Sequence, residues 1–149
     1  MIVRATSTAL KGVEWVNMVM DGTLPNVTIH ENKDGTIDVD GDVLIYEMNF
    51  FGFPFDFNII NGDFYCFQNK ITSLLGCPKI VHGSMVIHSN KLCSLKNCPR
   101  VVDEYFNISK NPLTNVDDIF RMKKCGHLIL DDEQMNLRKI KIFKRMQRL

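Results

Sequence analysis

Apolar residues recur at a fixed spacing of 21 residues through the middle of the chain. Three segments that begin at Gly62, Gly83 and Glu104 align without gaps, and a fourth, from Gly41, keeps the same apolar positions. After the first residue of each segment, apolar and variable positions alternate, which is typical of a strand with one buried face. The predicted buried face consists of Val43, Ile45, Phe64, Cys66, Met85, Ile87, Phe106 and Ile108.

An asparagine follows three of these predicted strands, at Asn69, Asn90 and Asn111. A carboxamide both donates and accepts hydrogen bonds, so a buried asparagine at a turn can bond to the backbone of its own unit and of the adjacent one. We therefore expect the three side chains to lie in a row. The unit that begins at Gly41 has Met48 at this position instead.

One unit of this length cannot bury its apolar side alone, so the units must stack. The predicted fold is an α/β repeat, a short solenoid with a parallel sheet whose strands lie ~4.8 Å apart. Within a single domain, residues 41–123 form four units, between an N-terminal cap at 1–40 and a basic helical cap at 124–149. The caps contain a helix at 11–22, a hairpin that turns at 32–35, a helical turn at 116–122, a strand at 128–130 and a helix at 133–148.

Two stretches resemble known repeat proteins. MVIHSNKL, residues 85–92, is similar to the leucine-rich-repeat core L-x-L-x-x-N-x-L. GDFYCFQNKITSLLGCPKIVHG, residues 62–83, the next unit and TIDVDGDV at 36–43 resemble a family of small leucine-rich-repeat-like proteins of tailed bacteriophages, with repeats of the form GxFxCxxNxLTSLxGCPxxV. The resemblance covers residues 25–116. It implies a leucine-rich-repeat-like solenoid, a phage origin and the cytoplasm of a bacterial host, and it implies no activity.

The other side of the predicted strands carries large apolar and aromatic side chains. Stacking places those of Tyr46, Phe67 and His88 in one row, and a second row lies beside it. An exposed patch of this kind commonly marks a contact site, where aromatic residues supply much of the energy. The predicted partner-binding residues are Leu44, Tyr46, Tyr65, Phe67, Val86, His88 and Tyr105. The alternatives are that a terminal segment covers this face or that the face forms a homodimer.

Composition is that of a soluble globular chain, with 45% hydrophobic and 23% charged residues. The net charge of +1 hides a split, with ten acidic and three basic residues up to residue 69 and seven acidic and fifteen basic residues after it. The tail is a candidate contact for an acidic partner or for phosphate, through Arg138, Lys139, Lys141, Lys144 and Arg145. A solvated capping helix is the alternative, because the helix dipole favours cations near a C-terminus.

Candidate chemistry is sparse. The five cysteines form no CxxC motif, and no hydrolase, phosphate-loop or paired-carboxylate motif occurs. Asp38, Asp40 and Asp42 lack the spacing of a calcium-binding EF-hand loop. Cys66 falls on the predicted buried face, although a nucleophilic pair of Cys66 or Cys93 with His88 stays conceivable. We therefore expect no catalysis, no metal and no cofactor.

The sequence thus favours a non-catalytic protein–protein interaction module. Together with the phage resemblance, this leads to the hypothesis that the protein binds a host protein and inhibits or redirects a host enzyme or defence factor. No signal peptide or membrane span is recognisable, so a cytoplasmic location without membrane contact is expected. The alternatives are a nucleic-acid-associated regulator that uses the basic C-terminal helix, and a small Cys/His enzyme.

Overall fold

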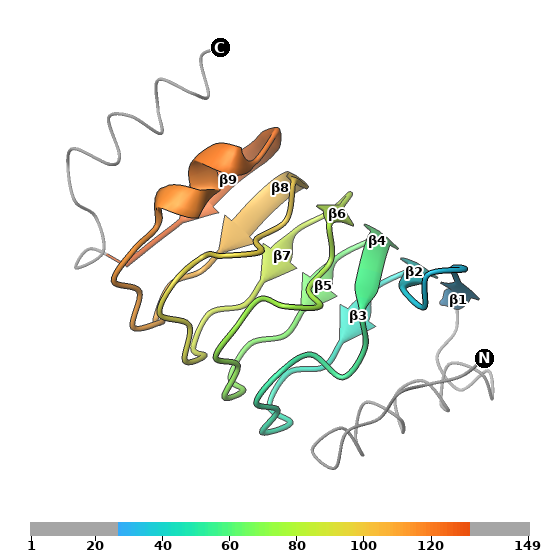
Figure 1. The fold of residues 1–149 in the computed structure, drawn as a ribbon, viewed down its shortest axis with the longest axis horizontal. Coiled ribbons are helices and arrows are strands. Elements are labelled where there is room, and N and C mark those ends of the chain that lie inside the picture. Colours follow the sequence, from blue (N-terminus) through green and yellow to red (C-terminus); the bar gives the residue numbers. More distant parts are fainter. Residues whose placement is uncertain (1–26, 132–149) are drawn as a thin grey trace.

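Each 21-residue unit forms one coil with two short strands that meet at a corner. The computed structural model describes residues 27–131, and Figure 1 shows the coils following one another along the solenoid. The strands are β1 (Thr28–Glu31), β2 (Ile37–Asp40), β3 (Val43–Leu44), β4 (Phe57–Asn61), β5 (Phe64–Tyr65), β6 (Ile80–Val81), β7 (Met85–Val86), β8 (Val101–Asn107) and β9 (Lys124–Ile129).

The strands make two arms of one nine-stranded sheet, in the order β1-β2-β4-β6-β8-β7-β5-β3, with β9 beside β8. The first arm contains β2, β4, β6 and the start of β8, and the second contains β3, β5, β7 and the end of β8. Neighbouring coils pair in parallel at a spacing of 21 residues, as Ile60 with Val81 on the first arm and Phe64 with Met85 on the second. The repeat solenoid with a parallel sheet is therefore confirmed.

The first arm is the main feature that the apolar alternation does not predict. The second arm lies where strands are expected, but each coil has another strand before the corner. β6 has only two residues, Ile80 and Val81, and its pairing with β4 and β8 defines it as a strand. β6 buries only Val81, whereas in the second arm the buried Met85 of β7 is followed two residues later by the buried Ile87. The alternation therefore indicates one strand per unit where the fold has two.

Glycine allows the sharp corner between the two arms. A Cβ atom on Gly83 would lie 2.1 Å from Asp63 Oδ1 and 2.7 Å from the carbonyl oxygen of Gly62. A Cβ atom on Gly62 would lie 2.4 Å from the carbonyl oxygen of Gly41. The backbones of these successive coils therefore approach at the corner more closely than a residue with a Cβ atom would permit.

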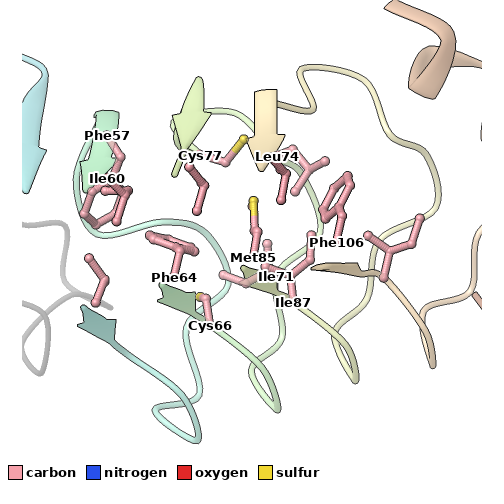
Figure 2. Packing of buried hydrophobic residues seen from close by; sticks show 14 of the residues in the cluster. Phe57, Ile60, Phe64, Cys66, Ile71, Leu74, Cys77, Met85, Ile87 and Phe106 are labelled. Atoms are coloured by element: carbon pink, nitrogen blue, oxygen red, sulfur yellow. The ribbon is translucent and has the colours of Figure 1, made fainter. Parts of the chain in front are cut away.

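The core lies between the two arms and the turns that connect them. All eight residues of the predicted buried face are at most 1% exposed, so this prediction is confirmed. Figure 2 shows the side chains of Phe64, Met85 and Phe106, which come from consecutive coils of the second arm, inside this core. Phe57 of β4 packs its ring edge against Phe64, with 5.1 Å between ring centroids, and so joins the first arm to the second.

The asparagine row is also confirmed. Asn90 Nδ2 donates to the carbonyl oxygens of Cys66 at 2.9 Å and Ile87 at 3.0 Å, and its Oδ1 accepts from the backbone N–H of Ile71 at 3.1 Å. Asn111 makes the equivalent three contacts one coil later. Asn69 makes the two contacts to the preceding coil, with Ile45 and Phe50, and its Nδ2 contacts Cys66 Sγ at 3.6 Å within its own coil. Each carboxamide therefore joins its own coil to the preceding one, and all three side chains are buried.

The solenoid continues at both ends of the four predicted units. The hairpin is confirmed, because β1 pairs with β2 in antiparallel fashion around the turn at 32–35. β2 also pairs in parallel with β4, and β9 pairs in parallel with β8, so residues 37–40 and 124–129 belong to the same ladder. The Cys-Pro turn of earlier coils is replaced by a 3-10 helix, η1 (Asp117–Arg121), within the predicted helical turn.

Helix is nearly absent from the part of the chain that the structure describes. Residues 27–131 contain η1 and no α-helix, so the solenoid itself is a β-structure rather than an α/β repeat. The coils of β-strands and turns close without a helix because the asparagine row satisfies the backbone groups of the turns. The helices expected at 11–22 and 133–148 lie outside the described residues.

Candidate interaction face

The outer side of the second arm presents three parallel rows of side chains. Backbone pairing places Leu44 beside Tyr65, Tyr65 beside Val86, and Val86 beside Asn107. A second row, two residues further along each coil, contains Tyr46, Phe67 and His88. The third row lies next to the corner and contains Asp42, Asp63, Ser84 and Tyr105.

The aromatic row is a continuous stack. The rings of Tyr46 and Phe67 lie 4.7 Å apart between centroids with only 2° between their planes, and those of Phe67 and His88 lie 4.8 Å apart at 16°. These distances match the ~4.8 Å separation of neighbouring strands, so the coil spacing itself holds the rings face to face. Tyr65 adds an edge contact to Phe67 from the neighbouring row, with centroids 6.5 Å apart.

The predicted partner-binding residues all point outward, but they do not form one patch. Leu44 and Tyr46 are exposed at 38% and 40%, and Tyr65, Phe67, Val86 and His88 are half-buried. Tyr105 is 53% exposed and belongs to the corner row. Its ring makes an edge-to-face contact with the ring of His127 of β9, with 5.5 Å between the two ring centroids. Six of the seven residues thus lie on two adjacent rows, and Tyr105 lies apart from them.

The corner row is held by bonds from side chain to backbone that the sequence pattern does not reveal. Asp42 Oδ1 accepts from the N–H of Asp63 at 2.8 Å, and Asp63 Oδ1 accepts from the N–H of Ser84 at 2.7 Å. Ser84 Oγ in turn accepts from the N–H of Tyr105 at 3.2 Å. These side-chain oxygens provide acceptors for backbone N–H groups near the corner, and so they fix the position of the corner row at the edge of the aromatic face.

Burial and nearby charges shift the pKa values of two side chains on this face, Tyr65 and His88. Partial burial raises the pKa of Tyr65, and the hydrogen bond that its hydroxyl donates to Asp63 Oδ2 at 3.0 Å raises it further. Partial burial lowers the pKa of His88, and the nearby charge of Lys110 adds to this effect. Both shifts favour the uncharged form of the ring.

Cys66 does not bring a nucleophile to this face. Cys66 is fully buried on the inner side of the sheet and His88 lies on the outer side, so the two cannot act as a pair. Burial raises the pKa of Cys66 and Cys77, and it raises the pKa of Cys98 to about 11. Cys93 is exposed, and its Sγ lies 3.9 Å from the carbonyl oxygen of Lys91.

Charged side chains on the first arm form small clusters that sequence spacing does not reveal. His82 Nδ1 and Lys124 Nζ each lie 2.9 Å from a carboxylate oxygen of Asp103, and these hydrogen bonds lower the pKa of Asp103. Asp38 Oδ1 accepts from the N–H of Ile59 at 3.0 Å, one coil later. Among residues 27–131, no three His, Cys, Asp or Glu side chains converge on a position that could hold a metal ion.

Two further sequence predictions concern the basic tail and the membrane. The basic tail residues Arg138, Lys139, Lys141, Lys144 and Arg145 lie outside the described residues. Within 27–131, no helix has the length and apolar character needed to cross a bilayer.

No family model matches the chain, and neither a curated protein nor a solved structure matches it.

Proposed function

We propose that the protein is a non-catalytic binding module that engages a protein partner through the outer side of the second arm. The observation that carries this proposal is the stack of Tyr46, Phe67 and His88 beside Leu44 and Tyr65. Large apolar groups on a solvent side contribute less to folding than buried ones do, and they supply affinity when a partner removes them from water. The parallel ladder pre-orders the rings, so binding costs little side-chain entropy.

The resemblance to phage proteins suggests the class of partner. We propose that the partner is a host protein, such as an enzyme or a defence factor, and that the mechanism is steric occlusion by the bound solenoid. Such a mechanism needs no reactive group on this chain. A homodimer through the same face is the competing arrangement, because an exposed apolar patch can bury itself against its own copy.

The test compares two double variants of the tagged full-length chain. Tyr65→Ala with Phe67→Ala removes the centre of the face, and Phe51→Ala with Leu75→Ala is the matched control. Phe51 and Leu75 are 53% and 71% exposed and lie on the turns, so this control removes as much exposed apolar surface elsewhere. Proteins captured from bacterial lysate by the wild type and the control, but not by the face variant, are then purified and titrated against all three.

We expect the face variant to lose at least about tenfold in affinity, since substitution of central interface aromatics typically costs more than ~1.4 kcal/mol each. The control should bind like the wild type. Equal affinity of all three proteins would exclude the face as the binding surface. A wild type that sediments as a dimer and becomes monomeric only in the face variant would establish the homodimer instead.

A further inference from the structure

The proposed binding face has an acidic border along the corner row. Asp42 and Asp63 stand in neighbouring coils, and Asp42 Oδ1 accepts from the N–H of Asp63 at 2.8 Å. Further along the corner, Glu104 Oε2 accepts from the hydroxyl of Ser84 at 3.3 Å. Among residues 27–131, none of these three carboxylates belongs to an ion pair. The described part of the chain thus leaves the negative charge of this border without a paired cation.

Tyr65, near the centre of the face, lies within the field of all three carboxylates. Partial burial raises the pKa of Tyr65 most, and the hydrogen bond to Asp63 Oδ2 raises it next. The charges of Asp63, Asp42 and Glu104 add to this increase. Carboxylates of its own coil and of coils on both sides therefore act on one ring. A partner that is electrostatically complementary to this position presents a cation there.

The ring of Tyr65 lies against the sheet, unlike the upright rings of the aromatic row. Tyr46 and Phe67 stack with 2° between their planes, so the plane of Phe67 stands across the direction in which the coils follow one another. The ring of Tyr65 is at 90° to that of Phe67, and its hydroxyl reaches back along its own coil to Asp63 at 3.0 Å. Both conditions place the ring of Tyr65 nearly parallel to the sheet, so one ring face is turned outward beside the carboxylates.

An arginine side chain matches both the ring and the charge. Its guanidinium group is planar and always positive, it stacks on aromatic rings, and it bonds to carboxylates through several N–H groups at once. A lysine ammonium group carries the same charge as a compact point and does not cover a ring in this way. An apolar or acidic partner segment would remove the carboxylates from water without giving them a partner, which costs free energy.

We propose that the partner protein lays an arginine side chain on the ring of Tyr65 and directs its N–H groups to the carboxylates of Asp63 and Asp42. This inference rests on the proposed function, since it names the chemistry of the partner at the same face. Each carboxylate oxygen can accept two hydrogen bonds, so Asp63 retains capacity for a further donor beyond Ser84 and Tyr65. Apolar residues of the same partner segment then cover the neighbouring aromatic row.

The first experiment needs no partner protein and uses N-acetyl-arginine amide as the probe. NMR follows the ring signals of Tyr65 as the probe is added to the full-length chain. N-acetyl-lysine amide supplies the compact cation, and N-acetyl-citrulline amide supplies an uncharged side chain of nearly the same shape. We expect a saturable shift with the arginine probe, at least about threefold weaker affinity for the lysine probe, and no shift with citrulline. Absence of a shift with arginine, or equal affinity for lysine, would overturn the proposal.

Two double variants test the role of the carboxylates. Asp42→Asn with Asp63→Asn removes both charges but keeps the Oδ1 atoms that accept from the N–H groups of residues 63 and 84, so the corner stays bonded. Asp34→Asn with Asp56→Asn is the matched control, which removes the same charge from two exposed positions outside the second arm. The first variant should bind the arginine probe at least about tenfold more weakly than the wild type, and the control should bind within about twofold of it. Equal losses in the two variants would contradict a specific site.

The same variants separate this inference from the proposed function. Affinity for a protein captured through the aromatic face should fall at least about tenfold in Asp42→Asn with Asp63→Asn and stay within about twofold in the control. A captured protein that loses affinity in Tyr65→Ala with Phe67→Ala, but keeps it in Asp42→Asn with Asp63→Asn, would overturn the arginine inference and leave the proposed function standing. Selective binding of the arginine probe without any protein captured through the face would support the arginine site and contradict the proposed function.

Discussion

The asparagine row and the aromatic row share the 21-residue spacing, but they use it in opposite ways. Asn69, Asn90 and Asn111 are at most 6% exposed and bond to the backbone of two coils. Tyr46, at the end of the aromatic row, is 40% exposed, and the rings of this row stack on one another face to face. Repetition by itself therefore does not separate residues that hold the coils together through buried hydrogen bonds from residues on the outer face; burial and hydrogen bonding do.

The sharpest test of this difference is Asn90→Ala. The change leaves the N–H of Ile71 and the carbonyl oxygen of Cys66 without this partner in a buried position, whereas the carbonyl oxygen of Ile87 keeps its hydrogen bond from Asn111. Each such group costs about 1–3 kcal/mol, so we expect the free energy of unfolding in urea to fall by at least about 2 kcal/mol. Asn107→Ala, the same substitution on the outer face, removes only the hydrogen bonds that Asn107 Oδ1 accepts from Ser109, which water can replace, and should cost about 1 kcal/mol. Similar losses in the two variants would contradict a structural role specific to the buried row.

The corner glycines should tolerate change almost as poorly. A Cβ atom on Gly83 would meet Asp63 Oδ1 and the backbone of Gly62, so the two coils must separate to admit it. Overpacking of this kind costs about 1–3 kcal/mol, and we expect Gly83→Ala to lower the urea midpoint accordingly. Gly52→Ala is the control, because a Cβ atom there has no neighbour within 4 Å. An unchanged midpoint in Gly83→Ala would show that the coils are not closely packed at the corner.

The aromatic row should matter less for folding than either of these sites. Phe67→Ala removes two stacked contacts from a half-buried position. We expect a loss of about 1–2 kcal/mol in the free energy of unfolding, measured in urea. Leu75→Ala should change it by less than about 0.5 kcal/mol, since Leu75 is 71% exposed. A loss in Phe67→Ala as large as that in Asn90→Ala would mean that the aromatic row is mainly a structural element.

The smallest expected effect is a pH dependence at His88. Burial, with the added charge of Lys110, holds the pKa of His88 below its ordinary value. As the pH falls from about 7 to about 5, the unfolded chain therefore takes up a proton before the folded chain does, and stability decreases. His88→Phe keeps the ring but should make this decrease smaller, as measured by urea midpoints at both pH values. A His88 titration in NMR spectra at or above the ordinary histidine pKa would contradict the prediction.

The sequence determined the solenoid, its inner residues and the asparagine row. These features repeat at a constant distance along the chain, and equivalent positions of a stacked repeat must coincide in space. The same logic placed Tyr46, Phe67 and His88 in one row, and their ring geometry follows from the coil spacing. The hairpin around residues 32–35 can also be predicted from the sequence, because its turn depends only on residues that are adjacent in the chain.

Only the tertiary structure decided where the repeat bends and how it continues. β6 buries a single residue and so shows no period of its own, and it exists because neighbouring coils supply hydrogen-bond partners. The residue of the last coil that pairs with Arg100 is hidden from a strict 21-residue alignment, which matches Arg100 with Arg121. Because the last coil contains η1, the residue bonded to Arg100 is Lys123 instead. Distance along the sequence therefore identifies equivalent residues as long as the coils have the same length. Where a coil changes length, only the hydrogen bonds between neighbouring coils show which residues are equivalent.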